Sequence, residues 1–362
     1  MLPADEFAAW LRLLETPGLG RDGARQLLAS FGSPEAVFDA PPAALRQVLG
    51  AARAAALANE PPAFAERLAA ARRWFASGAD HGVLTLGDAA YPPLLLQTAD
   101  PPLLLYVQGD PERLAQASLA IVGSRNPSAQ GLDNARAFGR HISDQGLLVV
   151  SGLAHGIDGA AHDGALAGAA GTIAVVGTGL DLVYPSRHRE LARRIREHGA
   201  IVSEFAPGTP ALPPNFPLRN RIIAGLSLGT LVVEAALRSG SLITARLAAE
   251  AGREVFAVPG SIHAPQSKGC HALIKQGAKL VETAADIVEE LHGLRPTAAA
   301  PAPVATPSPL LDALGHDPVT LDALLARTGW PASELSARLL ELELDGLVAR
   351  LPGGLFQRRT AA

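Results

Sequence analysis

The chain has 362 residues, of which 48% are hydrophobic and 18% are charged, and its formal net charge at pH 7 is −4. This length favours two or three compact domains, and the hydrophobic share excludes a generally disordered protein. The slightly acidic balance excludes a basic field over the whole protein, so a site for a polyanion has to be a local patch of positive charge.

The cysteine count and the first residues bear on the compartment. A single cysteine, Cys270, excludes an internal disulfide framework and a zinc site built from several cysteines. The chain starts with MLPADEF, which is acidic where a signal peptide is basic, and no apolar run reaches the roughly 18 residues of a membrane span. We therefore expect a cytoplasmic protein with no membrane contact.

Residues 1–60 carry apolar side chains at helical spacing and predict a helical domain, which a connecting helix over residues 61–82 joins to the rest. Between two of the first helices lies a tight turn, Gly18-Leu19-Gly20. Such a turn can offer backbone amides to a nucleic-acid phosphate, as in helix-hairpin-helix modules. Acidic residues close by favour the alternative, a plain helical bundle with a glycine turn.

Residues 83–292 alternate between short apolar strands and helices. Strands are expected at residues 83–86, 119–122, 147–150, 173–176, 200–203, 231–233 and 254–258. Helices are expected at residues 130–143, 157–167, 187–198, 242–251 and 268–276. Continuous apolar strands separated by helices predict an α/β fold with a doubly wound, mostly parallel Rossmann-like sheet. Ligands in such sheets bind at the carboxyl ends of the strands.

Two segments that contain prolines, residues 91–95 and 100–106, lie between the first of these strands and the second. Proline cannot donate a hydrogen bond to an inner ladder. We therefore expect both segments on a rim or edge of the sheet.

The C-terminal part begins with a proline- and alanine-rich linker over residues 293–309. Residues 310–362 predict a winged helix, with one helix at 321–326, a second at 333–345 and a β-hairpin over 347–358.

The second of these helices is expected to be capped by Ser333 and ended by Gly346. Arg338 is its single basic residue, against the acidic Glu334, Glu341, Glu343 and Asp345. This balance argues against duplex binding by the helix and favours a protein contact at least as much as a nucleic-acid contact.

Small and basic residues gather where the expected strands end. They are Gly123, Ser124 and Arg125, then Ser151 and Gly152, and later Ser239, Gly240 and Ser241 just before a helix. Glycine lets a backbone approach a ligand closely, and the free N–H groups of a helix start favour phosphate. The strand ends therefore predict an anion site.

A further helix is expected to start at Asn215, which can cap it, and to carry Arg219, Asn220 and Arg221 near its positive end. With Arg125, these side chains predict a phosphate-rich ligand. The alternative is that the arginines form surface ion pairs.

Other motifs carry less chemistry. Gly177-Thr178-Gly179 is a poor dinucleotide fingerprint, because no third glycine follows it. His155, Asp158 and His162 place three donors on roughly one helix face, but no second cluster completes a metal site, and helix capping and packing explain them equally well. Ser151 lacks a nucleophile elbow, and Cys270 has only His271 beside it. We expect no metal and no other cofactor, and neither Ser151 nor Cys270 supports a hydrolase.

Several long motifs in order resemble the DprA/Smf family over about residues 83–291. They are VGSRNPS from Val122, VVSGLAHGIDGAAH from Val149, VVGTGLDLVYP from Val175, SEFAPG from Ser203, NFPLRNRIIAGLS from Asn215, VVEAALRSGSLITARLAAEAGREVFAVPGSI from Val232 and KGCHALIKQGAKLV from Lys268. The resemblance implies an extended Rossmann domain with a sterile-alpha-motif-like start and a winged-helix end. It also implies a non-catalytic protein that binds single-stranded DNA and helps load the RecA recombinase onto it during natural transformation.

The resemblance also implies where the DNA and a second copy bind. The DNA pocket corresponds to the Gly123 to Arg125 turn, the Arg219 to Arg221 segment and the Ser239 to Ser241 turn, with Phe216 and Tyr184 as candidates for base stacking. Family members form homodimers through a segment that corresponds to residues 262–280. An apolar face there could come from Ile262, Cys270, Leu273, Ile274 and Leu280, and the same residues could equally be ordinary core.

Two other classes of protein stay open. Gly229-Thr230 and Glu234 suggest the phosphate loop of a lysine-decarboxylase-like nucleotide-processing enzyme, although the glycine pair that precedes this motif in such enzymes is missing. A protein-interacting scaffold that uses the winged helix is the third possibility.

Overall fold

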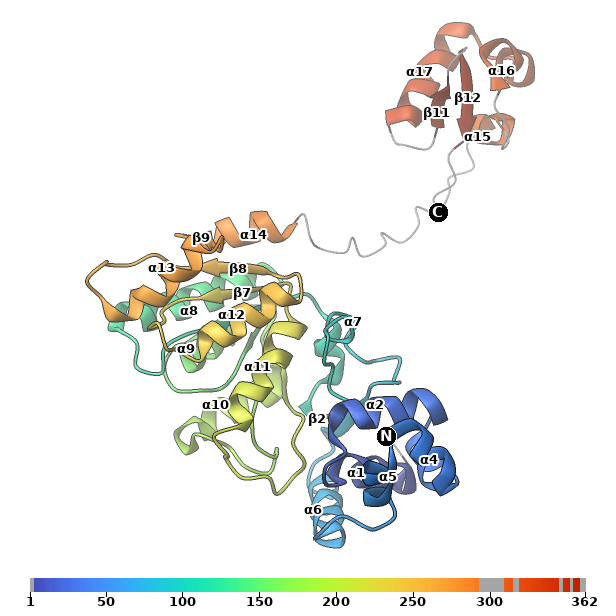
Figure 1. Ribbon diagram of the computed structural model, residues 1–362. Coiled ribbons are helices and arrows are strands. Elements are labelled where there is room, and N and C mark those ends of the chain that lie inside the picture. Colours follow the sequence, from blue (N-terminus) through green and yellow to red (C-terminus); the bar gives the residue numbers. More distant parts are fainter. Residues whose placement is uncertain (1–2, 293–308, 315–318, 345–347, 352–353, 359–362) are drawn as a thin grey trace. The chain divides into compact units, whose positions relative to one another are not determined.

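The computed structural model describes residues 3–292, 309–314, 319–344, 348–351 and 354–358. The chain divides into two compact units, residues 1–295 and 296–362 (Figure 1). The predicted linker up to residue 308 and the predicted helix end at Gly346 lie outside the described residues. No helix in the described part of the chain has the length and apolar character that a bilayer crossing requires.

The first unit begins with a bundle of helices. They are α1 (Ala4–Glu15), α2 (Gly20–Phe31), α3 (Pro34–Asp39), α4 (Pro42–Leu49), α5 (Ala51–Leu57) and α6 (Phe64–Ala76). The turn between α1 and α2 needs its glycines, because Gly18 and Gly20 have φ angles of 76° and 66°. Buried residues of the bundle such as Phe7 form one hydrophobic core with Leu104 and Tyr106 of the neighbouring sheet. The bundle is therefore packed onto the sheet.

A long mixed sheet forms the centre of the first unit. Its strands are β1 (His81–Thr85), β2 (Leu104–Gly109), β3 (Ser118–Val122), β4 (Leu148–Ser151), β5 (Thr172–Val175), β6 (Ala200–Ser203), β7 (Gly229–Val232), β8 (Glu254–Ala257) and β9 (Lys279–Leu280). The strand order is β1-β2-β6-β5-β4-β3-β7-β8-β9. The seven strands β6-β5-β4-β3-β7-β8-β9 pair in parallel with their neighbours. β2 pairs antiparallel with β6, and β1 pairs antiparallel with β2 at one edge of the sheet. The predicted mostly parallel Rossmann-like sheet is confirmed.

The prediction of a rim or edge position for residues 100–106 was wrong for residues 104–106, which belong to β2. β2 is an inner strand, since it pairs with β1 on one side and with β6 on the other. The two prolines, Pro101 and Pro102, precede the strand, so the ladder loses no N–H donor.

Helices cover both faces of the sheet, as the continuous apolar strands predicted. One face packs against α7 (Pro93–Leu96), α11 (Asn215–Leu226), α12 (Ser241–Glu250) and α13 (Lys268–Lys275). The other face packs against α8 (Ala129–Asp144), α9 (Ile157–Ala165), α10 (Arg189–His198) and α14 (Ala284–His292). Short 3₁₀ turns, η1 (Pro111–Ala115), η2 (Ser186–His188) and η3 (Pro265–Ser267), complete the connections.

The strand order reverses next to β3, which has β4 on one side and β7 on the other. The chain leaves β3 toward α8 on one face of the sheet and leaves β7 toward α12 on the opposite face. The two loops therefore diverge and leave a crevice at the carboxyl ends of these strands, where open α/β sheets bind their ligands.

The second unit has the elements of a winged helix. They are α15 (Pro309–Leu314), β10 (Val319–Thr320), α16 (Leu321–Thr328), α17 (Ala332–Leu344), β11 (Val348–Leu351) and β12 (Leu355–Arg358). The strands form a small sheet in the order β10-β12-β11. Leu324, Leu335, Leu339 and Phe356 are in its hydrophobic core. The helix pair and the hairpin confirm the predicted winged-helix fold.

Candidate functional site

An open pocket of about 680 Å³ lies at the reversal point of the sheet. Its walls come from the loops after β3, β4, β5 and β7 and from the start of α11. The sequence-predicted residues that line it are Gly123, Ser124, Arg125, Phe216, Arg219, Asn220, Ser239, Gly240 and Ser241. We call it the switch-point pocket.

Two arginines of this pocket are exposed to solvent. Arg125 follows β3 and Arg238 follows β7. Neither lies within ion-pair distance of a carboxylate among the described residues, whereas many other arginines of the chain do. Their guanidinium groups are thus available to an anionic ligand.

Aromatic rings lie beside Arg125. Its guanidinium carbon is 5.6 Å from the centroid of the Phe216 ring, and the Tyr184 ring is 5.6 Å from Phe216 at an interplanar angle of 34°. Tyr184 is 50% exposed. A cation next to exposed aromatic faces suits a nucleobase with its phosphate.

Arg219 places a third positive charge in the wall of the pocket, and it is only 5% exposed. It donates hydrogen bonds to the Gly152 carbonyl at 2.8 Å and to Asn220 Oδ1 at 2.7 Å, and its Nη2 lies 3.9 Å from Asp158 Oδ2. Its Nε has no protein partner within the described residues. Burial lowers the pKa of Arg219 to about 10, although Asp158 opposes the shift. The side chain therefore stays charged at neutral pH.

Ser151 and Gly152, two predicted binding residues, do not line the pocket. Ser151 is buried and its Oγ donates to the Ile121 carbonyl at 2.6 Å. At Gly152 a Cβ atom would lie 1.9 Å from Arg219 Nη2, so any other residue there would displace the guanidinium group from its place. Both residues support the loop that holds Arg219.

Asp158 fixes the same loop from α9. Its Oδ2 accepts hydrogen bonds from the Gly152 N–H at 3.2 Å and the Ala154 N–H at 3.4 Å. Burial raises the pKa of Asp158, while Arg219 and these backbone bonds act in the opposite direction.

Arg221 lies on another side of α11 and does not line the pocket. Its Nε is 2.9 Å from Asp100 Oδ2 and its Nη2 is 2.5 Å from Glu204 Oε1. Asp100 also pairs with Arg21 and Arg25 of α2. These five residues, which we call the Asp100 cluster, join the helical bundle to α11.

The start of α12 opens into the switch-point pocket. Ser239 Oγ accepts a hydrogen bond from the Ser241 N–H at 3.3 Å and lies 2.7 Å from Ser241 Oγ. Asn220 Nδ2 donates to the Gly240 carbonyl at 3.3 Å. This turn ties α11 to α12 at the pocket.

The predicted cap at Asn215 was wrong. Pro214 precedes the first helical residue of α11, and Asn215 Nδ2 instead donates to the Gly177 carbonyl at 3.1 Å. The bond holds the start of α11 against the loop after β5.

The metal hypothesis finds no support in the described residues. They contain no group of three or more His, Cys, Asp or Glu side chains that could hold a metal ion. His162 is fully buried, with Nδ1 2.7 Å from Thr172 Oγ1, and burial lowers its pKa to about 3.

The phosphate-loop hypothesis meets a similar obstacle. Gly229 and Thr230 are buried inside strand β7, which is paired on both sides. A strand in the middle of a sheet has no free amides with which to cradle a phosphate.

The residues predicted for a dimer contact fall into two groups. Ile262 is 65% exposed and Leu280 is 50% exposed, whereas Leu273 and Ile274 are half-buried against the core. Cys270 is fully buried, and its Sγ lies 3.5 Å from the Val232 carbonyl oxygen. Cys270 therefore belongs to the core and cannot contribute to an outer face.

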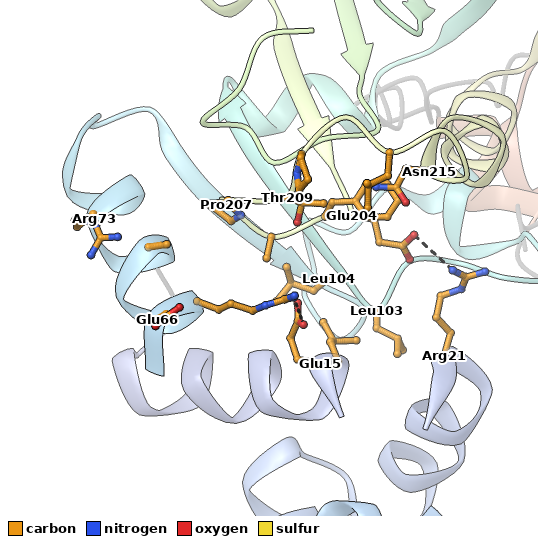
Figure 2. A pocket seen from close by; sticks show the side chains of 18 residues that line it. Glu15, Arg21, Glu66, Arg73, Leu103, Leu104, Glu204, Pro207, Thr209 and Asn215 are labelled. Atoms are coloured by element: carbon orange, nitrogen blue, oxygen red, sulfur yellow. Dashed lines mark hydrogen bonds and ion pairs between the residues drawn. The ribbon is translucent and has the colours of Figure 1, made fainter. Parts of the chain in front are cut away.

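A second pocket of about 650 Å³ lies between helices α1, α2 and α6 and the segment over residues 204–215 (Figure 2). Its charges are mixed and mostly paired, since Arg67 contacts Glu15 and Arg21 lies 3.9 Å from Glu204. Carboxylates in the wall repel a polyanion, so the switch-point pocket is the better phosphate site.

Arg238 is the arginine of the pocket that the sequence analysis missed. It directly precedes the predicted Ser239-Gly240-Ser241 turn, so an arginine beside a small-residue helix start was the available signal.

Comparison with known proteins gives one consistent family. The family model of DNA recombination-mediator protein A matches residues 82–292, and that of the DprA winged helix domain matches residues 295–354. Protein Smf of Escherichia coli (strain K12) is 47% identical over 294 residues, which are 78% of this chain and 79% of that protein.

Two solved structures agree. DNA processing protein A from Streptococcus pneumoniae has a TM-score of 0.67 at 36% identity, over 78% of this chain and 97% of that one. DNA processing protein A from Helicobacter pylori, studied for its single-stranded DNA binding mode, has a TM-score of 0.53 at 29% identity, over 58% of this chain and 96% of that one.

Proposed function

The chain belongs to the DprA/Smf family of DNA processing proteins, and we propose from this membership that it binds single-stranded DNA in the switch-point pocket. We further propose that it protects an incoming strand and helps load the RecA recombinase onto it in natural transformation, as a cytoplasmic homodimer without catalytic activity of its own.

The observation that carries the DNA proposal is a pair of arginines that line the pocket without a carboxylate partner in the described part of the chain. Arg125 and Arg238 are exposed and lack ion-pair partners among the described residues, and the buried Arg219 adds a third charge to the pocket wall. Phosphodiester groups supply the charge that such a site needs.

The same residues suit a single strand better than a duplex. Phe216 and Tyr184 can stack on unpaired bases, which a duplex keeps inside its own stack. The cations contact backbone phosphates and read no base edge. We therefore expect weak sequence preference and strong salt dependence. The strand-binding mode described for the Helicobacter pylori relative supports the proposal.

The remaining proposals rest on the family. For the dimer, the exposed Ile262 and Leu280 are the residues of the predicted segment that could meet a second copy. For RecA, the support is the family resemblance alone. For the winged helix, the acidic exposed face of α17 favours a protein partner.

A salt titration of full-length protein tests the DNA proposal. Binding to a fluorescent single-stranded oligonucleotide is followed by anisotropy, with a duplex of the same sequence as competitor. We expect a plot of log affinity against log salt to fall by about 0.7 for each phosphate contact, and the duplex to displace the strand poorly. Absence of binding at low salt would exclude this function.

A further inference from the structure

His155 lies on the loop between β4 and α9, at the rim of the switch-point pocket. The preceding residue, Ala154, lines the pocket. On the other side of His155, the Ile157 N–H donates to the Ser124 carbonyl at 3.1 Å and ties this loop to the loop after β3. His155 is therefore held next to the pocket and next to the loop that carries Arg125.

Two contacts fix the backbone on either side of His155. Leu153 has a φ angle of 55°, which is strained for a residue with a Cβ atom, and its carbonyl accepts a hydrogen bond from His188 Nδ1 at 3.0 Å. Gly156 has a φ angle of 81°, and a Cβ atom there would lie 2.4 Å from the Ser124 carbonyl oxygen. The loop therefore presents His155 at a defined place and tolerates strain to do so.

Within the described residues, neither ring nitrogen of His155 has a hydrogen-bond partner, although Nδ1 is buried. The ring contacts His188 edge to face, with the centroids 5.2 Å apart and an interplanar angle of 81°. A buried histidine that serves only packing normally bonds to a protein group, as His162 does to Thr172 Oγ1. The imidazole of His155 is therefore available to a ligand.

The side chains that act on His155 are mostly cationic. Arg125 comes from the loop after β3, and Arg187 and His188 come from η2. Arg187 is exposed and has no carboxylate within ion-pair distance among the described residues, whereas Arg194 of α10 pairs with one. The positive charges beside His155 are thus left without a protein counter-charge.

The acid on the adjoining helix does not compensate these charges. Asp158 of α9 is buried, and its carboxylate already accepts two backbone hydrogen bonds and lies 3.9 Å from Arg219. Burial lowers the pKa of His155, and its three neighbours Arg187, His188 and Arg125 lower it further. In the free protein the imidazole is therefore mainly neutral at pH 7.

We infer that His155, Arg125 and Arg187 form a phosphate subsite at the rim of the switch-point pocket, and that His155 takes up a proton from the solvent when a phosphodiester binds there. A phosphodiester brings the negative charge that this group of side chains lacks, so it stabilises the imidazolium form that the free protein disfavours. The imidazolium can then donate a charge-assisted hydrogen bond to the phosphate. That the phosphodiester belongs to a single strand rests on the proposed function.

The direction of the pH effect follows from this proton uptake. A bound phosphate raises the pKa of His155 above its value in the free protein, so the complex holds more protons than the free protein does. Affinity for the strand should therefore rise as the pH falls through the range in which His155 titrates. Arginine contacts alone give no such dependence, because arginine stays charged throughout.

The experiment measures the affinity of full-length protein for a fluorescent oligothymidylate at constant salt and at about pH 8, 7 and 6, the range over which histidine side chains titrate. Thymine and the phosphodiester link keep their charge over this range. We expect the parent to bind at least about threefold more tightly at the lowest pH than at the highest, and His155→Gln to lose this gain. Arg187→Ala should bind about fivefold more weakly than the parent at about pH 7, as the loss of one phosphate contact does.

His198→Gln is the matched control, since it removes an exposed histidine at the far end of α10, one helix length of about 15 Å from η2. It should keep the gain in affinity that the parent shows. Equal affinities of the parent at all three pH values would overturn the inference, and so would a gain that His155→Gln retains. Parent-like binding by Arg187→Ala would remove Arg187 from the subsite.

A second measurement separates this inference from the proposed function. In histidine-labelled protein, NMR follows the titration of the His155 ring, whose signal is the one absent from His155→Gln. Sulfate, which keeps its charge over this range, should raise the pKa of His155 more than chloride does at equal ionic strength. Equal effects of the two anions would overturn the subsite. A parent that binds no strand at any pH contradicts the proposed function, while the sulfate titration still decides the role of His155.

Discussion

The switch-point pocket and the Asp100 cluster each contain three arginines, and they use them in opposite ways. In the cluster, Arg21, Arg25 and Arg221 all contact Asp100, and Arg221 also contacts Glu204. In the pocket, Arg125 and Arg238 have no carboxylate within ion-pair distance among the described residues, and Arg219 has Asp158 only at 3.9 Å. Both regions contain arginines, and they differ in whether carboxylates from other parts of the sequence lie beside them. The comparison teaches that these carboxylates decide which group of arginines can bind a polyanion.

Helix α11 connects the two regions. Arg219 and Arg221 are two residues apart, which in an α-helix turns their side chains about 200° away from each other. One side chain therefore enters the pocket and the other enters the cluster. A motif that is continuous in sequence serves two separate tasks.

The largest expected effect comes from substitution of Arg219. This arginine lines the pocket, as Arg125 and Arg238 do, but it is buried, and it lies beside a carboxylate, as the arginines of the cluster do. Arg219→Met removes the cation beside Asp158 and leaves that carboxylate buried without a counter-charge. We expect a loss of about 3 kcal/mol of unfolding free energy, measured by urea denaturation. Weaker single-strand binding should accompany it.

Arg238→Ala is the control for this prediction, since it removes an exposed arginine from the same pocket. Its unfolding free energy should stay within about 0.5 kcal/mol of the parent value. Parent-like stability of Arg219→Met would show that Asp158 does not depend on Arg219.

The next effect concerns Asp100, where the stability of the cluster should depend on pH. Burial raises the pKa of Asp100, but hydrogen bonds and charges from Arg25, Arg221 and Arg21 outweigh it and lower the pKa to about 2. A carboxyl with a depressed pKa stabilises the fold above its unfolded value of 3.8 and loses that contribution as the pH falls toward 2. The cluster should therefore weaken only in acid.

Asp100→Asn tests this dependence. At neutral pH we expect it to lower the unfolding free energy by about 1–2 kcal/mol, allowing for the partial exposure of Asp100. In urea denaturation from about pH 5 down to about pH 2, the difference from the parent should shrink. A difference that stays constant over this range would mean that Asp100 contributes through packing and not through its charge.

The sequence predicted the parallel sheet well, because strands such as β3 and β4 are buried on both faces and read as continuous apolar runs. It missed β2, because Pro101 and Pro102 stand directly before that strand and suggested an edge. The short β10, over Val319–Thr320, is too brief to show any alternation.

The part of the pocket that lies at the strand ends could be predicted from the sequence. Glycines and serines mark the turns at Gly123 and Gly240, and both line the pocket. The fate of Arg221 could not be predicted, because its partner Asp100 lies 121 residues away in the chain. Glu204 is 17 residues away and belongs to another loop. Such pairings depend on the three-dimensional packing and leave no local pattern.

The smallest expected effect is that of Arg125→Ala on single-strand binding. It is also the sharpest test of the comparison, because the same substitution can be made at an arginine of each region. Arg125→Ala removes an exposed cation from the pocket, and we expect about 1 kcal/mol weaker single-strand binding, a salt slope lower by about 0.7 and unchanged stability. Arg221→Ala removes a paired cation from the cluster, so it should reduce the unfolding free energy and leave the salt slope as it is. Anisotropy titrations at several salt concentrations, with urea denaturation of the same samples, measure both quantities. If Arg221→Ala lowers the salt slope as much as Arg125→Ala does, Arg221 reaches the strand in the complex, and the division between a binding region and a structural region fails.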